Sequence, residues 1–325
     1  MAKADHIKAL IKSHAAGDDA RFYAIAMQVA AKAARSGHGK FAQELRELVD
    51  QAKSRASTAK PRKPVPIAQP RGELAGLLTV GYPTTRLAEM ALGPEVQRRI
   101  ERSLVEQRQR ERIKEHGFSP IRKLLLVGPP GTGKTMTAAA LSGELGLPLF
   151  SIQLHGLITK YMGETAAKLR VIFDAIGETR GVYLFDEFDA LGSERASRND
   201  VGEIRRVLNS FLQFLEQDDS DSLIIAATNH SRLLDRALFR RFDSVVEYFL
   251  PTAEIAEHVM RHRLASLDTQ SVQWSAAVAA AEGLSHAEIA RACEQAAKNA
   301  ILEHSTVVDT EGLVEALKER RATQG

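Results

Sequence analysis

Five short apolar runs alternate with helix-like stretches in the middle of the chain. The runs lie at residues 124–127, 149–154, 182–185, 223–227 and 245–249. A short continuous apolar run is typical of a strand that is buried on both faces. Strands that alternate with helices form a parallel sheet with helices on both sides. The pattern therefore predicts an α/β domain at residues 73–251, built on a parallel five-stranded sheet.

The hydrophobic pattern differs on either side of this domain. Residues 252–325 hold apolar positions at helical spacing and no further strand pattern, so we expect about four helices in a C-terminal lid domain. Residues 1–53 contain three short stretches with one apolar stripe each, which predicts a small helical bundle. Residues 54–72 hold four prolines and five basic residues. Such sequence stays extended, so we expect a linker there.

Composition limits the class of protein. The chain has 325 residues and one cysteine, Cys293, so no disulfide can form within it, and its alanine-rich surroundings predict burial on a helix. It has no run of eighteen apolar residues and no apolar core of a signal peptide at its start, so we expect a cytoplasmic protein without a membrane span. Residues 1–72 carry 14 basic and 6 acidic residues, a net charge of +8. This basic region suits an acidic partner or nucleic acid, and it equally suits a solvated tail.

The most specific motif follows the first predicted strand. Residues 128–135 read Gly-Pro-Pro-Gly-Thr-Gly-Lys-Thr and precede an alanine-rich run. Strand, glycine-rich loop and helix, in that order, form the phosphate-binding loop of an α/β P-loop NTPase. Its backbone N–H groups surround phosphate, its lysine reaches the β- and γ-phosphates, and its last hydroxyl binds Mg²⁺. We therefore predict ATP and Mg²⁺ as ligands, with ATP contacts from Pro129, Pro130, Gly131, Thr132, Gly133, Lys134, Thr135 and Met136.

Polar residues at the ends of two other strands complete the predicted chemistry. The run 182–185 ends in Asp186 and Glu187. We expect Asp186 to hold Mg²⁺ with Thr135, and Glu187 to polarise the attacking water. Asn229 follows the predicted strand Leu223–Thr228 and is placed to orient water or the γ-phosphate. Arg240 and Arg241 could reach the γ-phosphate of another subunit as arginine fingers, although paired arginines are more often surface charge.

Residues 73–323 resemble the AAA ATPases. The matching motifs are Gly128–Thr135, Phe185–Asp189, Ala226–Asn229 and Leu234–Asp243, and the adjacent Arg240-Arg241-Phe242 is similar to the katanin and spastin branch. The resemblance implies a hexameric ring in which Arg240 and Arg241 act across subunits. Gly283–Ile289 resembles the start of the lid helix beside the adenine, which adds Ala287 to the expected ATP contacts. Ala287 stands where related ATPases outside this branch carry a sensor arginine.

A further resemblance concerns the substrate. Lys160, Tyr161, Met162 and Gly163 resemble the first pore loop of protein-threading AAA rings, in which an aromatic residue grips an extended chain. The glycine would permit a tight turn, and methionine adapts to varied shapes. The alternative is a buried tyrosine in an ordinary loop. Residues 195–200 would form a second, polar pore loop.

These observations favour an ATP-hydrolysing ring protein that remodels or unfolds a protein substrate. Two alternatives stay open: a nucleic-acid motor or loader, and the unfoldase partner of a separately encoded protease. The chain contains neither His-Glu-x-x-His nor Gly-x-Ser-x-Gly, so it holds neither of these protease signatures. Residues 1–53 would then bind an adaptor or protease partner.

Overall fold

The computed structural model describes residues 76–152, 162–188, 201–229, 239–303 and 306–323, together with residues 29, 43, 74 and 154. Side chains are described throughout these residues except at 162–164 and 201–206. The chain divides into two compact units, residues 1–64 and 65–325. The predicted bundle at 1–53 and the predicted linker at 54–72 lie outside the described residues, apart from Val29 and Gln43, which are both helical.

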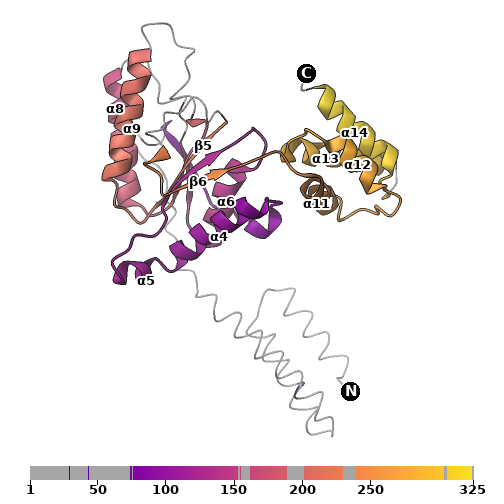
Figure 1. Cartoon of the computed structure of the whole chain (residues 1–325), viewed down its shortest axis with the longest axis horizontal. Coiled ribbons are helices and arrows are strands. Elements are labelled where there is room, and N and C mark those ends of the chain that lie inside the picture. The colour runs from indigo at the N-terminus through magenta and orange to yellow at the C-terminus, as the bar shows by residue number, and fades with distance from the viewer. Residues whose placement is uncertain are drawn as a thin grey trace. The chain divides into compact units, whose positions relative to one another are not determined.

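One mixed sheet organises the second unit (Figure 1). Within the described residues the sheet has six strands, in the spatial order β1-β3-β4-β5-β2-β6. The strands are β1 (Leu78–Gly81), β2 (Lys123–Val127), β3 (Leu149–Ile152), β4 (Val182–Phe185), β5 (Leu223–Thr228) and β6 (Ser244–Glu247). Strands β2 to β6 pair in parallel and fall on the five predicted runs. The predicted parallel core is therefore confirmed.

Strand β1 corrects the prediction of a purely parallel sheet of five strands. It pairs antiparallel with β3, in a register that joins Leu78 to Ile152, and it forms one edge of the sheet. Its sequence is Leu-Thr-Val-Gly, and only Leu78 in it is buried. An edge strand needs no continuous apolar run, so this one does not stand out in the hydrophobic pattern. An antiparallel edge strand on an otherwise parallel sheet is a common arrangement.

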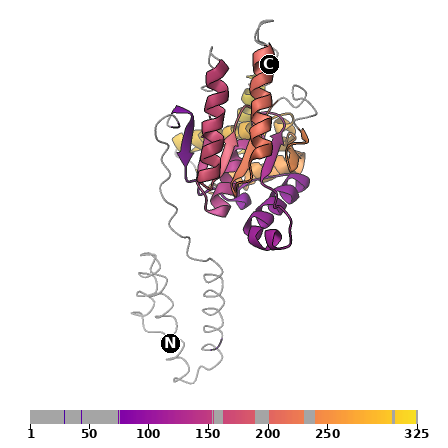
Figure 2. The same ribbon diagram turned by 90° about the vertical axis from the view of Figure 1, so that its left-hand side faces the viewer.

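Helices cover both faces of the sheet (Figures 1 and 2). Helices α4 (Pro94–Arg108) and α6 (Lys134–Leu145) pack on one face, while α8 (Met162–Glu178) and α9 (Val201–Gln217) lie side by side on the other. Strand β2 is buried on both sides: Leu124 and Leu126 join the α4 and α6 cluster, and Leu125 joins the other. A short helix, α5 (Arg110–Glu115), and a 3₁₀ turn, η2 (Leu87–Glu89), flank α4 in sequence.

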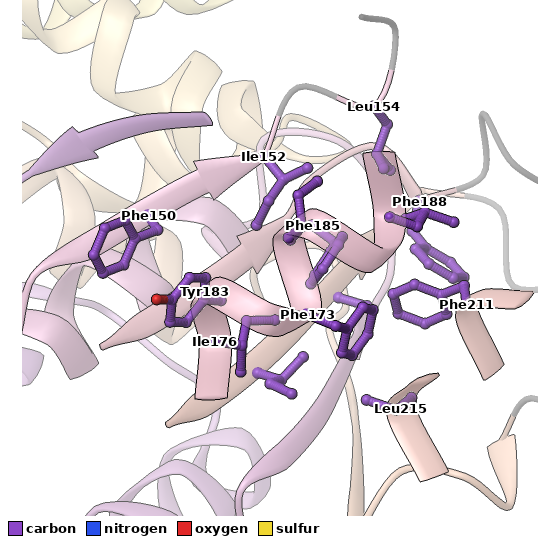
Figure 3. Close-up of a cluster of buried hydrophobic side chains, with 14 of the residues drawn as sticks. Phe150, Ile152, Leu154, Phe173, Ile176, Tyr183, Phe185, Phe188, Phe211 and Leu215 are labelled. Carbon is purple, nitrogen blue, oxygen red and sulfur yellow. The ribbon is translucent and has the colours of Figure 1, made fainter. Parts of the chain in front are cut away.

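Buried aromatic rings fix the end of β4 (Figure 3). Phe185 is the last residue of β4 and packs edge-on against Phe211 of α9, with ring centroids 5.0 Å apart. Phe188 contacts the same ring at 4.8 Å. Phe185 and Phe188 are both fully buried. The two residues between them are Asp186 and Glu187, so the core holds the backbone on either side of the predicted carboxylate pair.

In the described part of residues 252–323, four helices follow the sheet, as predicted for the lid: α11 (Ala253–Arg263), α12 (Trp274–Ala281), α13 (His286–Leu302) and α14 (Thr310–Ala322). They bury an apolar cluster of their own, which includes Met260, Ile289 and Leu313. Cys293 lies in this cluster, and burial raises the pKa of its thiol to about 12. Its predicted burial is confirmed. In the part of the chain that the structure describes, no helix has the length and apolar character that a membrane span requires.

Candidate nucleotide site

The phosphate-binding loop is packed between β6 and the lid. Gly128 has φ 150°, and a Cβ at this position would lie 2.3 Å from the carbonyl oxygen of Tyr248, just after β6. Gly131 has φ 74°, and a Cβ there would lie 2.5 Å from the hydroxyl oxygen of Ser285, which caps α13. Both positions therefore require glycine, for conformation and for space.

Lys134 is folded over the loop. Its Nζ donates to the carbonyl oxygens of Gly128 and Pro129, at 2.7 and 2.8 Å. The residue is only 6% exposed, so its positive charge lies within the loop. Lys134 is also the first residue of α6, and a helix N-terminus adds partial positive charge and unpaired N–H groups. The arrangement suits an anion such as phosphate.

Thr135 and Asp186 come together as predicted. The Thr135 hydroxyl donates to Oδ2 of Asp186 at 2.7 Å, and the backbone N–H of Glu187 donates to Oδ1 of the same carboxylate at 2.9 Å. Glu187 is exposed and has φ 51°, the only positive φ of a non-glycine residue among those described. A left-handed glutamate is strained, and such strain is concentrated at functional sites. Phe185 and Phe188, buried on either side, hold this conformation.

A cavity of about 420 Å³ joins these groups. Most of the predicted residues line it: Pro130, Gly131, Thr132, Gly133, Lys134, Thr135, Met136, Asp186, Glu187, Asn229 and Ala287. Pro129 is not part of the lining, and its carbonyl oxygen instead accepts from Lys134 and from the Thr132 hydroxyl. The Ala287 N–H donates to the Gly131 carbonyl oxygen at 3.0 Å, which attaches the lid to the loop. The cavity is in the size range of ligand pockets, about 300–1,000 Å³.

The sequence prediction missed a second part of the lining. It comes from the segment Glu89–Leu92 and from lid residues His258, Val259, His262, Arg263, His286 and Ala290. The spacing of His258 and His262 places both on one helix face, and this is the one feature of the sequence that could have indicated this part of the lining. Burial lowers the pKa of His286, and the backbone of Ala91 acts in the opposite direction. His286 is therefore neutral at physiological pH.

Arg240 and Arg241 do not line this cavity. They lie just before β6 with exposed side chains, and Arg241 forms an ion pair with Glu216 near the end of α9. We expect both arginines to reach the γ-phosphate in the site of another subunit. This role stays a prediction, because the structure contains one chain. Residues 230–238, which hold the start of that motif, lie outside the described residues.

The predicted pore residues are only partly described. Lys160 and Tyr161 lie outside the described residues, as does the second predicted pore loop at 195–200. Met162 and Gly163 are the first two residues of α8. Gly163 was expected in a tight turn, and this expectation is wrong, because the backbone there is helical. The first turn of a helix accepts glycine, since its N–H groups have no partner within the helix.

Comparison with known proteins identifies the family. Residues 124–250 match the family described as "ATPase family associated with various cellular activities (AAA)". The chain is also 33% identical to an uncharacterized AAA family ATPase of Sinorhizobium fredii over 327 residues, which is 100% of this chain and 98% of that protein. The chain belongs to the AAA family of ATPases. It is therefore an ATP-hydrolysing enzyme, and the prediction of an α/β P-loop NTPase is confirmed.

Other relatives of this AAA protein are larger. It is 35% identical to the ATP-dependent zinc metalloprotease FtsH 1 of Methylacidiphilum infernorum over 203 residues, 60% of this chain and 32% of that one. It is 33% identical to the proteasome-activating nucleotidase of Sulfurisphaera tokodaii over 221 residues, 65% of this chain and 56% of that one. The chain thus spans about a third to a half of these two proteins. These relatives do not support the predicted katanin and spastin branch.

Proposed function

We propose that this protein is a ring-forming ATPase that uses ATP hydrolysis to unfold or remodel a protein substrate. One observation carries the proposal: a single cavity is lined by both the sheet domain and the lid. The Ala287 N–H of the lid donates to the Gly131 carbonyl oxygen of the phosphate-binding loop. A change in the phosphates therefore acts directly on the position of the lid. Closure of one domain on another is a common way to turn a nucleotide cycle into movement.

The residues present fit ATP with Mg²⁺. The loop N–H groups and Lys134 would hold the phosphates, while the Thr135 hydroxyl and the Asp186 carboxylate are the hard oxygen ligands that Mg²⁺ prefers. Within the described residues, no cluster of three or more His, Cys, Asp or Glu side chains could hold a metal. Mg²⁺ needs no such cluster, because phosphates and water supply its other ligands. When bound, it neutralises charge on the phosphate oxygens.

Glu187 is the proposed general base. It is exposed, lines the cavity and directly follows the carboxylate that Thr135 contacts. Glu187 takes a proton from water while the water oxygen bonds to the γ-phosphorus. The bond from that phosphorus to the bridging β-phosphate oxygen breaks, and ADP and phosphate are released. Asn229, at the end of the neighbouring strand β5, would orient the water or the γ-phosphate.

The proposed ring explains the position of the two arginines. Arg240 and Arg241 are exposed and are not part of the lining of the cavity in their own chain. An arginine that reaches the γ-phosphate of the next subunit would complete a site that one chain lacks. We propose a hexamer on the resemblance to AAA proteins.

A protein substrate is favoured by two of the relatives. Their printed names describe an ATP-dependent metalloprotease and a proteasome-activating nucleotidase, which both relate to protein degradation. The segment Lys160–Gly163 would grip the substrate through the Tyr161 ring. The absence of His-Glu-x-x-His from these 325 residues favours remodelling, or unfolding for a separate protease, over proteolysis by this chain.

The test measures ATP hydrolysis with an unfolded protein and, separately, with DNA. Unfolded protein should raise the rate, and Tyr161→Ala should remove that stimulation while basal hydrolysis stays within about threefold, because no nucleotide contact is touched. Tyr161→Phe is the matched control and should keep the stimulation, since it retains the ring. Stimulation by DNA alone would instead support the nucleic-acid motor.

A further inference from the structure

Tyr248 contacts the phosphate-binding loop and the helix that follows it. The residue comes directly after β6, and its backbone N–H donates to the carbonyl oxygen of Val127 at 2.7 Å, just before the loop begins. Its own carbonyl oxygen occupies the space that a Cβ at Gly128 would need. Its side chain, which is buried, reaches Thr137 in α6. Tyr248 therefore connects the end of β6 to both sides of the loop.

The hydroxyl groups of Tyr248 and Thr137 form a buried hydrogen-bonded chain. The two oxygens are 2.7 Å apart, and Thr137 is completely buried. The Thr137 hydroxyl has one proton and donates it to the carbonyl oxygen of Gly133 at 3.0 Å, so Tyr248 is the donor to Thr137. Burial raises the pKa of the Tyr248 phenol, while the hydrogen bond with Thr137 acts in the opposite direction. The phenol therefore keeps its proton and can donate it.

The last acceptor of this chain belongs to the phosphate-binding loop. Gly133 directly precedes α6 and has φ 101°, a conformation that few residues other than glycine adopt. The peptide between Gly133 and Lys134 is planar and trans, so its C=O and N–H point in opposite directions. A Gly133 carbonyl that is held toward Thr137 therefore directs the Lys134 N–H out of the helix N-terminus, toward the cavity that Gly133 and Lys134 line.

We propose that Tyr248 and Thr137 are positioning residues for the phosphates of the nucleotide, because their hydroxyls fix the peptide before Lys134 with its N–H toward the phosphates. The inference rests on the proposed nucleotide site. Neither side chain is part of the lining of that cavity, so both act through the loop. A threonine hydroxyl often bonds to the carbonyl four residues earlier in a helix. In this protein a second hydroxyl, from the end of β6, fixes the direction of the first.

The experiment compares the affinity for ADP, measured by calorimetry, with the melting temperature. Tyr248→Phe combined with Thr137→Val replaces both hydroxyls by apolar groups of similar shape, which is nearly neutral for stability. This double variant should melt close to the wild type and bind ADP about tenfold more weakly, because the N–H that meets a charged phosphate is no longer fixed. Thr137→Ser keeps the hydroxyl and should retain most of the affinity.

Single variants separate positioning from stability. Thr137→Val leaves the buried Tyr248 hydroxyl without its partner, so it should melt below the double variant and bind ADP equally weakly. Tyr248→Phe leaves no donor unpaired and should weaken ADP binding about threefold or more. Tyr183→Phe is the matched control, because this buried hydroxyl donates to the carbonyl oxygens of Ala175 and Thr179 in and after α8. It should lower the melting temperature and leave the ADP affinity unchanged.

Two kinds of outcome are distinguishable. Wild-type affinity for ADP in the double variant, or a loss of affinity that follows the melting temperature across these variants, would overturn the inference alone. Failure of the wild-type protein to bind ADP, or binding that Lys134→Ala leaves intact, would instead overturn the proposed nucleotide site.

Discussion

Thr135 and Asp186 are joined by a hydrogen bond of 2.7 Å although 51 residues separate them in sequence. The other oxygen of the same carboxylate accepts the backbone N–H of Glu187. One carboxylate thus connects the helix after the phosphate-binding loop to the backbone of the proposed base. A substitution of Asp186 disturbs both contacts, whereas a substitution of the Glu187 side chain leaves both in place. Substitutions of Asp186 and of Glu187 should therefore have different effects on the enzyme.

Glu187→Gln should bind ATP nearly normally and hydrolyse it about 10²–10⁴-fold more slowly, the usual effect of losing a general base. The amide keeps the size of the side chain but cannot take the proton from water. Single-turnover hydrolysis and equilibrium binding of ATP measure the two effects separately.

Two control variants distinguish hydrolysis from binding. Lys134→Ala should weaken ATP binding itself, because it removes the charge inside the loop. Asp186→Asn should lower the apparent affinity for Mg²⁺, which Glu187→Gln should not. Near-normal turnover by Glu187→Gln would remove Glu187 from the proposed mechanism.

Arg240→Ala protein should be inactive alone and should recover part of its ATP hydrolysis when mixed with Glu187→Gln protein. Mixed rings contain interfaces that pair an intact Glu187 with an intact Arg240 from the neighbour. Hydrolysis should also rise with protein concentration, because the proposed site is complete only when a second subunit supplies its arginine. The measurement is specific activity across a dilution series and across mixing ratios.

The ion pair of Arg241 with Glu216 allows its contribution to stability to be tested apart from the role in hydrolysis. Glu216→Gln removes the partner of Arg241 within its own chain, and both side chains are exposed. We expect a change in stability of less than about 1 kcal/mol, as for most exposed ion pairs.

Full activity of Arg240→Ala in dilute solution would show that this arginine is only surface charge.

The strands of the core were predictable because they are buried on both faces. Leu124, Leu125 and Leu126 are completely buried, so β2 is a continuous apolar run whichever way its side chains point. Strand β1 escaped prediction because Thr79 is exposed and Val80 is only half buried. Burial on one side of an edge strand leaves too few apolar positions to stand out.

In the candidate site, too, some residues could be predicted from the sequence and others could not. The loop at 128–135 and the pair Asp186 and Glu187 are local motifs, so residue type and spacing were sufficient. The segment Glu89–Leu92 and residue His286 reach the cavity only through tertiary packing. No local pattern connects these positions, which are almost 200 residues apart. No local pattern connects Tyr248 to Gly128 either, although the Tyr248 carbonyl oxygen leaves no space for a Cβ at position 128.

Gly128→Ala should destabilise the protein by about 1–3 kcal/mol or more, the range for forcing extra atoms into a packed interior. The new Cβ would lie 2.3 Å from a backbone oxygen, which cannot move as a side chain does. Gly177→Ala in α8 is the matched control, because a Cβ there meets nothing within 4 Å. It should stabilise by roughly 0.5–1 kcal/mol, the helix preference of alanine over glycine. Thermal melts of the two variants check this difference in sign, and equal melting temperatures would contradict it.

The stability of the nucleotide-free protein should fall in mild acid partly through His286. Burial lowers the pKa of His286 from its ordinary value of 6.5, so below that pH the unfolded chain binds a proton that the folded chain excludes. The free energy of unfolding therefore falls as the pH falls, by at most about 1.4 kcal/mol per pH unit for one proton. Denaturant unfolding between about pH 7.5 and pH 5.5 should show a smaller decrease for His286→Gln than for the wild type. Glu89, His258, His262 and Arg263 line the same cavity, and they are present in both proteins, so their contributions cancel in the comparison. Parallel pH curves for the two proteins would show that the imidazole is not held neutral by the fold.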